Sequence, residues 1–92
     1  MRRAARVDAN QSEIIRAAEQ LGCTVQPLYQ VGGGCPDLLL GHASKRGRVN
    51  LLIEIKTDAG KLTPEQIRFH REWRGQVAVI RSVPELLALL KG

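Results

Sequence analysis

The sequence predicts a single α/β domain, and three kinds of pattern predict it. Two apolar runs, 37–40 and 49–56, have the length and composition of central strands. Three segments begin with helix-capping signals and continue with apolar residues at helical spacing. A chain of 92 residues forms one domain, and at this size it buries only about 60–65% of the surface that its unfolded form exposes. A partner subunit would therefore help its stability.

The chain begins with a basic segment, 1–9, that we expect to form an N-terminal arm ahead of a folded domain at 10–92. Asn10 and Glu13 have the spacing of a capping box, which predicts the start of a helix. Apolar residues follow at helical spacing, and Gly22 ends this first helix.

The next segment, 24–30, is short and extended, and Pro27 confines it to an edge strand or an irregular one. The apolar runs 37–40 and 49–56 follow as central strands. The polar segment 41–48 between them contains glycine and joins them into a hairpin.

A second helix should begin at Thr63, with Pro64 at its first position and Gln66 as the third residue of a capping box. This helix should end at Gly75. Residues 77–81 have the composition of a buried strand, and a leucine-rich helix completes the chain. The predicted order is helix, strand, strand, strand, helix, strand, helix.

The charge balance favours a polyanionic partner. The net charge is +5, with 25% charged and 43% hydrophobic residues, as in a folded basic domain. No secretory signal or membrane-length apolar run is visible, so we expect an intracellular protein whose cysteines stay reduced and which has no membrane partner. The candidate nucleic-acid-binding residues are Arg2, Arg3, Arg6, Lys45, Arg46, Arg48, Lys61, Arg68 and Arg71. A merely solvated hairpin tip is the alternative for the cluster at 45–48.

Charged residues interrupt both central strands. Side chains alternate faces along a strand, so Glu54 and Lys56 are neighbours on one surface while Ile55 points to the other. A carboxylate buried without a partner costs several kcal/mol. We therefore expect Asp37, Glu54 and Lys56 to be held by one another or by a cation.

These residues fit metal-assisted phosphodiester hydrolysis. If the hairpin brings Asp37 beside Glu54, they converge with a free backbone carbonyl at the strand edge, for which Ile55 is the candidate. Such hard oxygen ligands suit Mg²⁺ or Mn²⁺ and are poor for zinc. Lys56 can orient the attacking water and offset charge that grows on the phosphate.

Blander interpretations compete with this one. Glu13 and Gln66 can complete the site, but each also has a role as a helix cap. Glu54 and Lys56 can form an exposed ion pair, and Asp37 can be a turn residue after a proline. A zinc site is disfavoured, since no close cysteine pair accompanies the candidates Cys23, Cys35, His42 and His70.

The motifs resemble a known group of nucleases. The pair Pro36-Asp37 with Glu54-Ile55-Lys56 resembles the PD-(D/E)XK nuclease superfamily. With Gly34-Cys35-Pro36-Asp37-Leu38 and the run 62–66, the chain from 10 to 90 is similar to the virus-type replication-repair nuclease (VRR-NUC) family. The resemblance implies a restriction-endonuclease-like core built on an α+β mixed sheet.

The resemblance also implies roles for individual residues. Asp37 and Glu54 bind the divalent cation, Lys56 is catalytic, and Glu13 and Gln66 lie near the centre. Stand-alone members, encoded largely by phages, resemble Holliday-junction resolvases, which form homodimers and cut branched DNA. By this resemblance we expect a phage protein in the cytoplasm of a bacterial host cell.

The leading hypothesis is a Mg²⁺- or Mn²⁺-dependent, structure-selective endonuclease acting on branched DNA as a homodimer. No motif for reading base edges and no small-molecule substrate is indicated. A non-catalytic nucleic-acid-binding module, a flap or sequence-specific nuclease of the same superfamily, and a protein-interaction module remain as alternatives.

Overall fold

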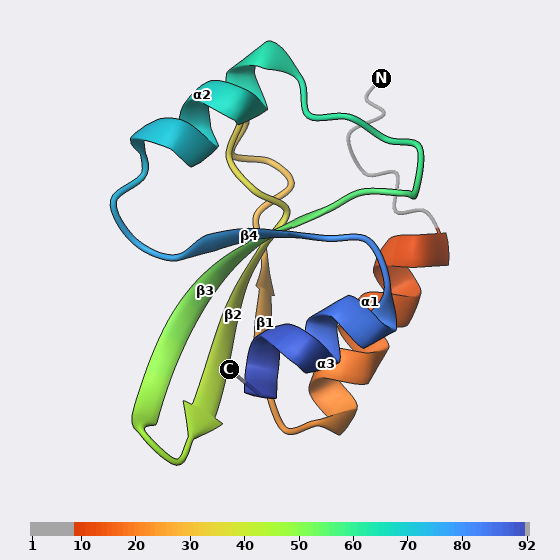
Figure 1. Cartoon of the computed structure of the whole chain (residues 1–92), viewed down its shortest axis with the longest axis vertical. Helices are drawn as coiled ribbons and strands as arrows, with labels where there is room; N and C mark the ends of the chain where they lie inside the picture. Colours follow the sequence, from red (N-terminus) through yellow and green to blue (C-terminus); the bar gives the residue numbers. More distant parts are fainter. Residues whose placement is uncertain (1–8, 92) are drawn as a thin grey trace.

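The structure, a computed structural model, describes residues 9–91 and has the predicted order of elements (Figure 1). The elements are α1 (Ala9–Gln20), β1 (Thr24–Pro27), β2 (Leu38–Ser44), β3 (Gly47–Ile55), α2 (Pro64–Glu72), β4 (Val77–Ile80) and α3 (Val83–Lys91). The α/β fold class is confirmed. The predicted arm residues Arg2, Arg3 and Arg6 lie outside the described residues.

One mixed sheet of four strands, in the order β1-β2-β3-β4, forms the middle of the fold. The first three strands are antiparallel neighbours, whereas β4 runs parallel to β3. Parallel neighbours require a crossover connection, and the segment that contains α2 supplies it. The restriction-endonuclease-like mixed sheet expected from the resemblance is thus present.

The hairpin between β2 and β3 is longer than predicted. Strand pairing continues to Ser44 opposite Gly47, so only two residues of the expected loop form the turn. The Ser44 hydroxyl accepts from the N–H of Arg46 at 3.1 Å and donates to the Gly47 carbonyl at 2.9 Å. These local bonds stabilise a tip that carries few apolar residues.

The main core lies between the sheet and the helices α1 and α3, which pack beside each other (Figure 1). Leu51, Ile53 and Ile55 of β3 belong to this core together with Ile14 of α1 and Leu86 of α3. Leu52 and Glu54 are also buried but alternate to the opposite face. The predicted alternation along β3 is confirmed.

One local prediction is wrong. Asn10 lies inside α1 rather than capping it, and its side-chain amide donates to the carbonyl of Lys56 at 2.9 Å. Asn10 and Glu13 therefore form no capping box. Phe69 stacks on the half-exposed ring of Trp73 with ring centroids 5.2 Å apart, and α2 has no buried residue.

The functional elements gather at the end of the sheet opposite the β2–β3 hairpin (Figure 1). There β3 ends, β2 begins, and α2 starts after the loop 56–63. Within residues 9–91, each helix is too short or too polar to span a membrane.

Candidate active site

Asp37 is held at the end of the sheet, where the ladder between β2 and β3 stops. The ladder pairs Leu38 with Ile53, so the next hydrogen-bonded position would pair Pro36 with Ile55. Proline has no N–H, so Pro36 cannot donate to the carbonyl of Ile55. The carbonyl of Ile55 therefore lacks this ladder partner, and the N–H of Ile55 donates to Oδ2 of Asp37 at 2.7 Å. The Asp37 carboxylate and the Ile55 carbonyl are thus both kept at this edge.

Glu54 is the buried centre of the site. Its side chain is 2% exposed, and its Oε2 atom accepts a hydrogen bond from Nε2 of Gln66 at 3.2 Å. Its Oε1 atom is buried and has no hydrogen-bond partner among the described residues. Burial and then the neighbouring Asp37 raise the pKa of Glu54 to about 8, against the opposing effect of Lys56. The two carboxyl groups are close enough for a hydrogen bond when one is protonated.

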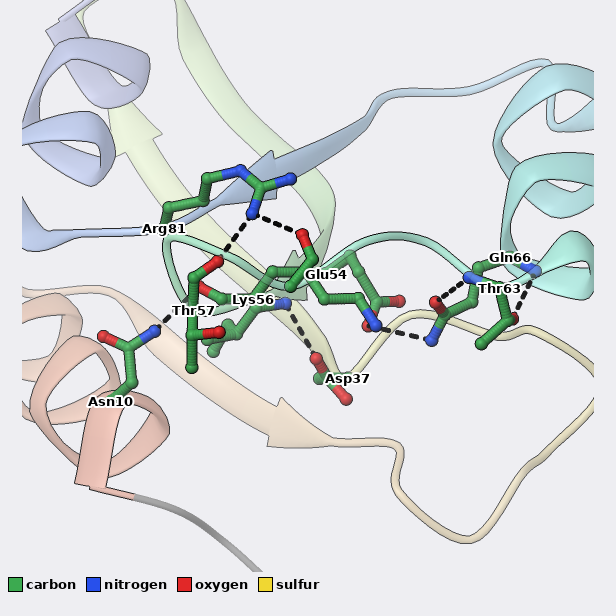
Figure 2. A network of polar contacts seen from close by, with 10 residues as sticks. Asn10, Asp37, Glu54, Lys56, Thr57, Thr63, Gln66 and Arg81 are labelled. Carbon is green, nitrogen blue, oxygen red and sulfur yellow. Dashed lines mark hydrogen bonds and ion pairs between the residues drawn. The ribbon is translucent and has the colours of Figure 1, made fainter.

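Lys56 follows the end of β3 and is fixed through its backbone. Its N–H donates to the carbonyl of Ile80 at 3.1 Å, and its carbonyl accepts from Asn10 (Figure 2). The Nζ atom lies 4.0 Å from Oε2 of Glu54, and the Lys56 side chain is 17% exposed. Because Glu54 is fully buried, the exposed ion pair considered from the sequence does not describe this contact.

Gln66 serves the helix and the site with one side chain. Its Oε1 atom accepts from the N–H of Thr63 at 2.9 Å, and its own N–H donates to the Thr63 hydroxyl at 3.2 Å. This is the predicted capping box, which is confirmed. The amide nitrogen of the same side chain reaches Glu54 (Figure 2). A glutamate could form the cap but could not donate to Glu54.

Arg81 has a structural role that the sequence did not predict. From the end of β4, its guanidinium donates to the carbonyls of Thr57 at 2.6 Å and Gly60 at 2.7 Å (Figure 2). It thereby anchors the loop that directly follows Lys56. No local pattern marks this role, because it depends on where β4 ends relative to β3.

His70 was considered from the sequence only as a zinc ligand. It lies one turn after Gln66 on α2, and its Nε2 atom is buried with no hydrogen-bond partner among the described residues. Burial and then the charge of Lys56 lower the pKa of His70. Its imidazole is therefore neutral at neutral pH.

The other predicted site residues are more dispersed. Glu13 is exposed on α1, and its side chain forms no hydrogen bond or ion pair with the residues that the structure describes. Lys61, Arg68 and Arg71 are exposed at the same end as Glu54. The hairpin residues Lys45, Arg46 and Arg48 lie at the other end of β2, which spans seven residues. At about 3.3 Å per residue, β2 spans roughly 20 Å along the sheet.

The cysteines are separated in the fold. Cys23 lies 3.7 Å from Nδ1 of His42. Burial, followed by the charges of Glu54 and Asp37, raises the pKa of the Cys35 thiol. Among residues 9–91, no three side chains of His, Cys, Asp or Glu are grouped so that they could hold one metal ion. A protein-bound cation here would rely on fewer side chains.

The residues present fit a hard divalent cation. Asp37, Glu54 and the carbonyl of Ile55 offer only oxygen ligands, as Mg²⁺ and Mn²⁺ prefer. A cation would satisfy the unpartnered Oε1 atom of Glu54 and offset the repulsion between the two carboxylates. With only two carboxylates, most coordination positions would remain for water and substrate.

Comparison with known proteins gives a consistent result. The family model of the VRR-NUC domain matches residues 3–84. A solved structure described as a VRR-NUC domain is 29% identical to this chain, with a TM-score of 0.69, and the match covers 91% of this chain and 97% of that one. No curated protein matches the chain. The matched region includes Asp37, Glu54, Lys56 and Gln66.

Proposed function

Because this chain belongs to the VRR-NUC domain family, a nuclease-type family, we propose that it is a Mg²⁺- or Mn²⁺-dependent endonuclease that cuts branched DNA as a homodimer. The single observation that carries the proposal is the carboxylate pair formed by the partly buried Asp37 and the buried Glu54, with an unpartnered oxygen on Glu54 and the ammonium group of Lys56 beside it. Members of this family are generally metal-dependent.

Asp37, Glu54 and the carbonyl of Ile55 would hold the cation. When bound, it supplies a Lewis acid that polarises the phosphodiester and lowers the pKa of a water molecule. The N–H of Ile55 fixes the orientation of Asp37, and Gln66 fixes that of Glu54. These contacts organise the site before substrate arrives, which lowers the cost of reaching the transition state.

Lys56 would act on the substrate directly. Its Nζ atom lies beside Glu54 and its side chain is 17% exposed, so it can donate to a phosphate oxygen. A lysine ammonium group stabilises the negative charge that grows there in the transition state. The ammonium group can also orient the attacking water by donating a hydrogen bond to its oxygen atom.

The basic residues support binding through the phosphate backbone. Lys61 precedes α2 and Arg68 and Arg71 are exposed on α2, the helix that carries Gln66, whereas Lys45, Arg46 and Arg48 lie at the far end of the hairpin. Contacts of this kind carry no sequence information. Basic groups beyond the two ends of a strand that spans roughly 20 Å suit DNA arms that diverge from a branch point.

Homodimer formation is supported by chemistry and by surface composition. Resolution of a four-way junction requires two symmetric nicks, and one subunit has one carboxylate pair. Ile67 and Trp73 are each 48% exposed on and next to α2, and Leu87 of α3 is 40% exposed. Such side chains favour burial against a second copy.

A cleavage assay with matched variants tests the proposal. Four-way junction, flap, splayed-arm and linear duplex DNA would be incubated with Mn²⁺, Mg²⁺ or EDTA. We expect paired nicks in the junction with either cation and none in EDTA. Lys56→Ala should lose cleavage and retain binding, whereas Lys91→Ala, at the exposed end of α3, should cut normally.

Two results would contradict the proposal. Equal cleavage by Lys56→Ala would remove the assigned role of the ammonium group. Salt-sensitive DNA binding with no cation-dependent cleavage of any substrate would favour the non-catalytic binding module instead.

A further inference from the structure

We propose that Gly34 is a positioning residue for the active site. Its backbone lies against the first turn of α2 and sets where Gln66 meets Glu54. The effect on cleavage rests on the proposed nuclease function. The contact itself is a property of the fold and can be tested separately.

The space around Gly34 is closed by the backbone of α2. A Cβ atom at this position would collide with the carbonyl oxygen of Glu65, and it would lie 2.7 Å from the carbonyl carbon of Glu65 and 3.1 Å from the nitrogen of Gln66. Real Cβ atoms essentially never approach within 3.0 Å of another heavy atom. Only glycine allows this close approach.

The neighbouring glycine provides a contrast within the same loop. Gly33 has a φ of +66°, and Gly34 has a φ of +83°, so both adopt a conformation that strains other residues. A Cβ atom at Gly33 would meet nothing within 4 Å. Alanine at either position therefore introduces backbone strain, but only alanine at Gly34 also collides with α2.

The start of α2 would have to move to relieve the collision. The atoms that obstruct Gly34 belong to backbone, which cannot rotate away as a side chain can. The capping box between Thr63 and Gln66 ties the residues of this first turn together, so we expect them to move as one body. No residue of α2 is buried, so little packing resists a displacement of the helix.

Gln66 would be the first residue to lose its contact. Its Nε2 atom lies 3.2 Å from Oε2 of Glu54, at the long end of the range for such hydrogen bonds, so a displacement of about 1 Å would break it. The same loop continues into Asp37, three residues after Gly34. Gly34 thus links the loop that leads to Asp37 with α2, the helix whose Gln66 orients Glu54.

Nuclear magnetic resonance tests the contact without requiring nuclease activity. In the wild-type protein, we expect nuclear Overhauser effects between the Hα protons of Gly34 and the amide proton of Gln66. The side-chain amide signals of Gln66, identified by their absence in Gln66→Ala, should move toward free-glutamine positions in Gly34→Ala. They should stay in place in Gly33→Ala.

Cleavage gives the functional readout. Gly34→Ala should cut about 10- to 100-fold more slowly than wild type, as expected for a misplacement of about 1 Å, and Gly33→Ala should be within about twofold of wild type because its Cβ atom is free. In a Gln66→Ala background, Gly34→Ala should cause little further loss.

The outcomes separate the two proposals. Absence of the wild-type Overhauser effects, or unchanged Gln66 side-chain signals in a folded Gly34→Ala protein, would overturn the positioning role. The wild-type spectrum decides the contact even if Gly34→Ala does not fold. If Gly34→Ala loses the Gln66 contact and the wild-type protein itself cuts no DNA, the positioning role is supported and the nuclease proposal is contradicted.

Discussion

The Oδ2 atom of Asp37 accepts a hydrogen bond from the backbone N–H of Ile55 at 2.7 Å. This bond ties the carboxylate to the end of β3, beside the buried carboxyl group of Glu54. Asp37 cannot turn toward solvent without leaving the N–H of Ile55 unpaired, at a cost of about 1–3 kcal/mol. The fold therefore holds two carboxyl groups beside each other, and in the absence of a cation ionisation of both is unfavourable.

We expect the metal-free protein to lose stability as the pH rises from about 5 to about 8. Burial and Asp37 raise the folded-state pKa of Glu54 from 4.5 to about 8, so the folded state retains a proton that the unfolded chain has released. The free energy of unfolding then falls with pH in this window, by an amount on the order of a few kcal/mol. Urea unfolding in EDTA across this range measures the slope.

The Glu54→Gln variant provides the direct comparison. It has no titrating group at this position, so its stability should change much less over the same pH range and should exceed that of wild type at about pH 8. Glu19→Gln, an exposed change on α1, should keep the wild-type slope. An equal slope in Glu54→Gln would contradict the assignment of the titration to Glu54.

Gln66→Glu separates the two roles of Gln66. The carboxylate can still accept from the N–H of Thr63 and preserve the cap, but it cannot donate to Glu54 and adds a negative charge. We expect lower stability in EDTA at about pH 8 and cleavage reduced by about tenfold or more. Wild-type stability and cleavage in this variant would show that the contact with Glu54 has no consequence.

Arg81→Ala should loosen the loop that follows Lys56. The variant removes the donor to the carbonyls of Thr57 and Gly60. We expect faster amide hydrogen exchange in residues 57–60 and a loss of about 1–3 kcal/mol in the free energy of unfolding. Arg74→Ala, at an exposed position after α2, is the control and should change neither quantity. Unaltered exchange in Arg81→Ala would contradict the anchoring role.

The two basic groups should differ in their dependence on substrate. Arg68 and Arg71 are exposed on α2, the helix whose Gln66 contacts Glu54, so their double alanine variant should weaken binding to every DNA and lower the salt slope by about one per lost contact. Alanine at Lys45 and Arg46, at the far end of β2, should weaken only substrates with arms long enough to reach the hairpin. Titrations at several salt concentrations measure both effects, and identical losses on short and long arms would exclude the proposed path of the DNA.

Local sequence signals predict the order of elements because they act within a few residues. The capping box of Thr63 and Gln66 and the alternation along β3 depend on neighbouring residues, and both are present in the structure. The hairpin length was missed because residues 41–48 are polar. Its strand ends extend beyond the core, where no apolar pattern marks them.

Contacts between distant elements account for what the sequence did not predict. Asn10 is a residue type that often caps helices, but its side chain donates to the carbonyl of Lys56, which the folded sheet brings near. Arg81 reaches the loop 57–60 because β4 lies parallel to β3. Gly34 has its role only because α2 docks against it. None of these relationships has a signature in the local sequence.

A crystal structure determined with Mn²⁺ tests the central claim most directly. Anomalous scattering should place one or more Mn²⁺ ions against the carboxylates of Asp37 and Glu54 and the carbonyl of Ile55, with Lys56 nearby. The Asp37→Asn and Glu54→Gln variants should lose that signal under the same conditions. Manganese absent from wild-type crystals, or bound elsewhere while both carboxylates keep their present arrangement, would contradict the assignment of this pair as the metal site of a nuclease.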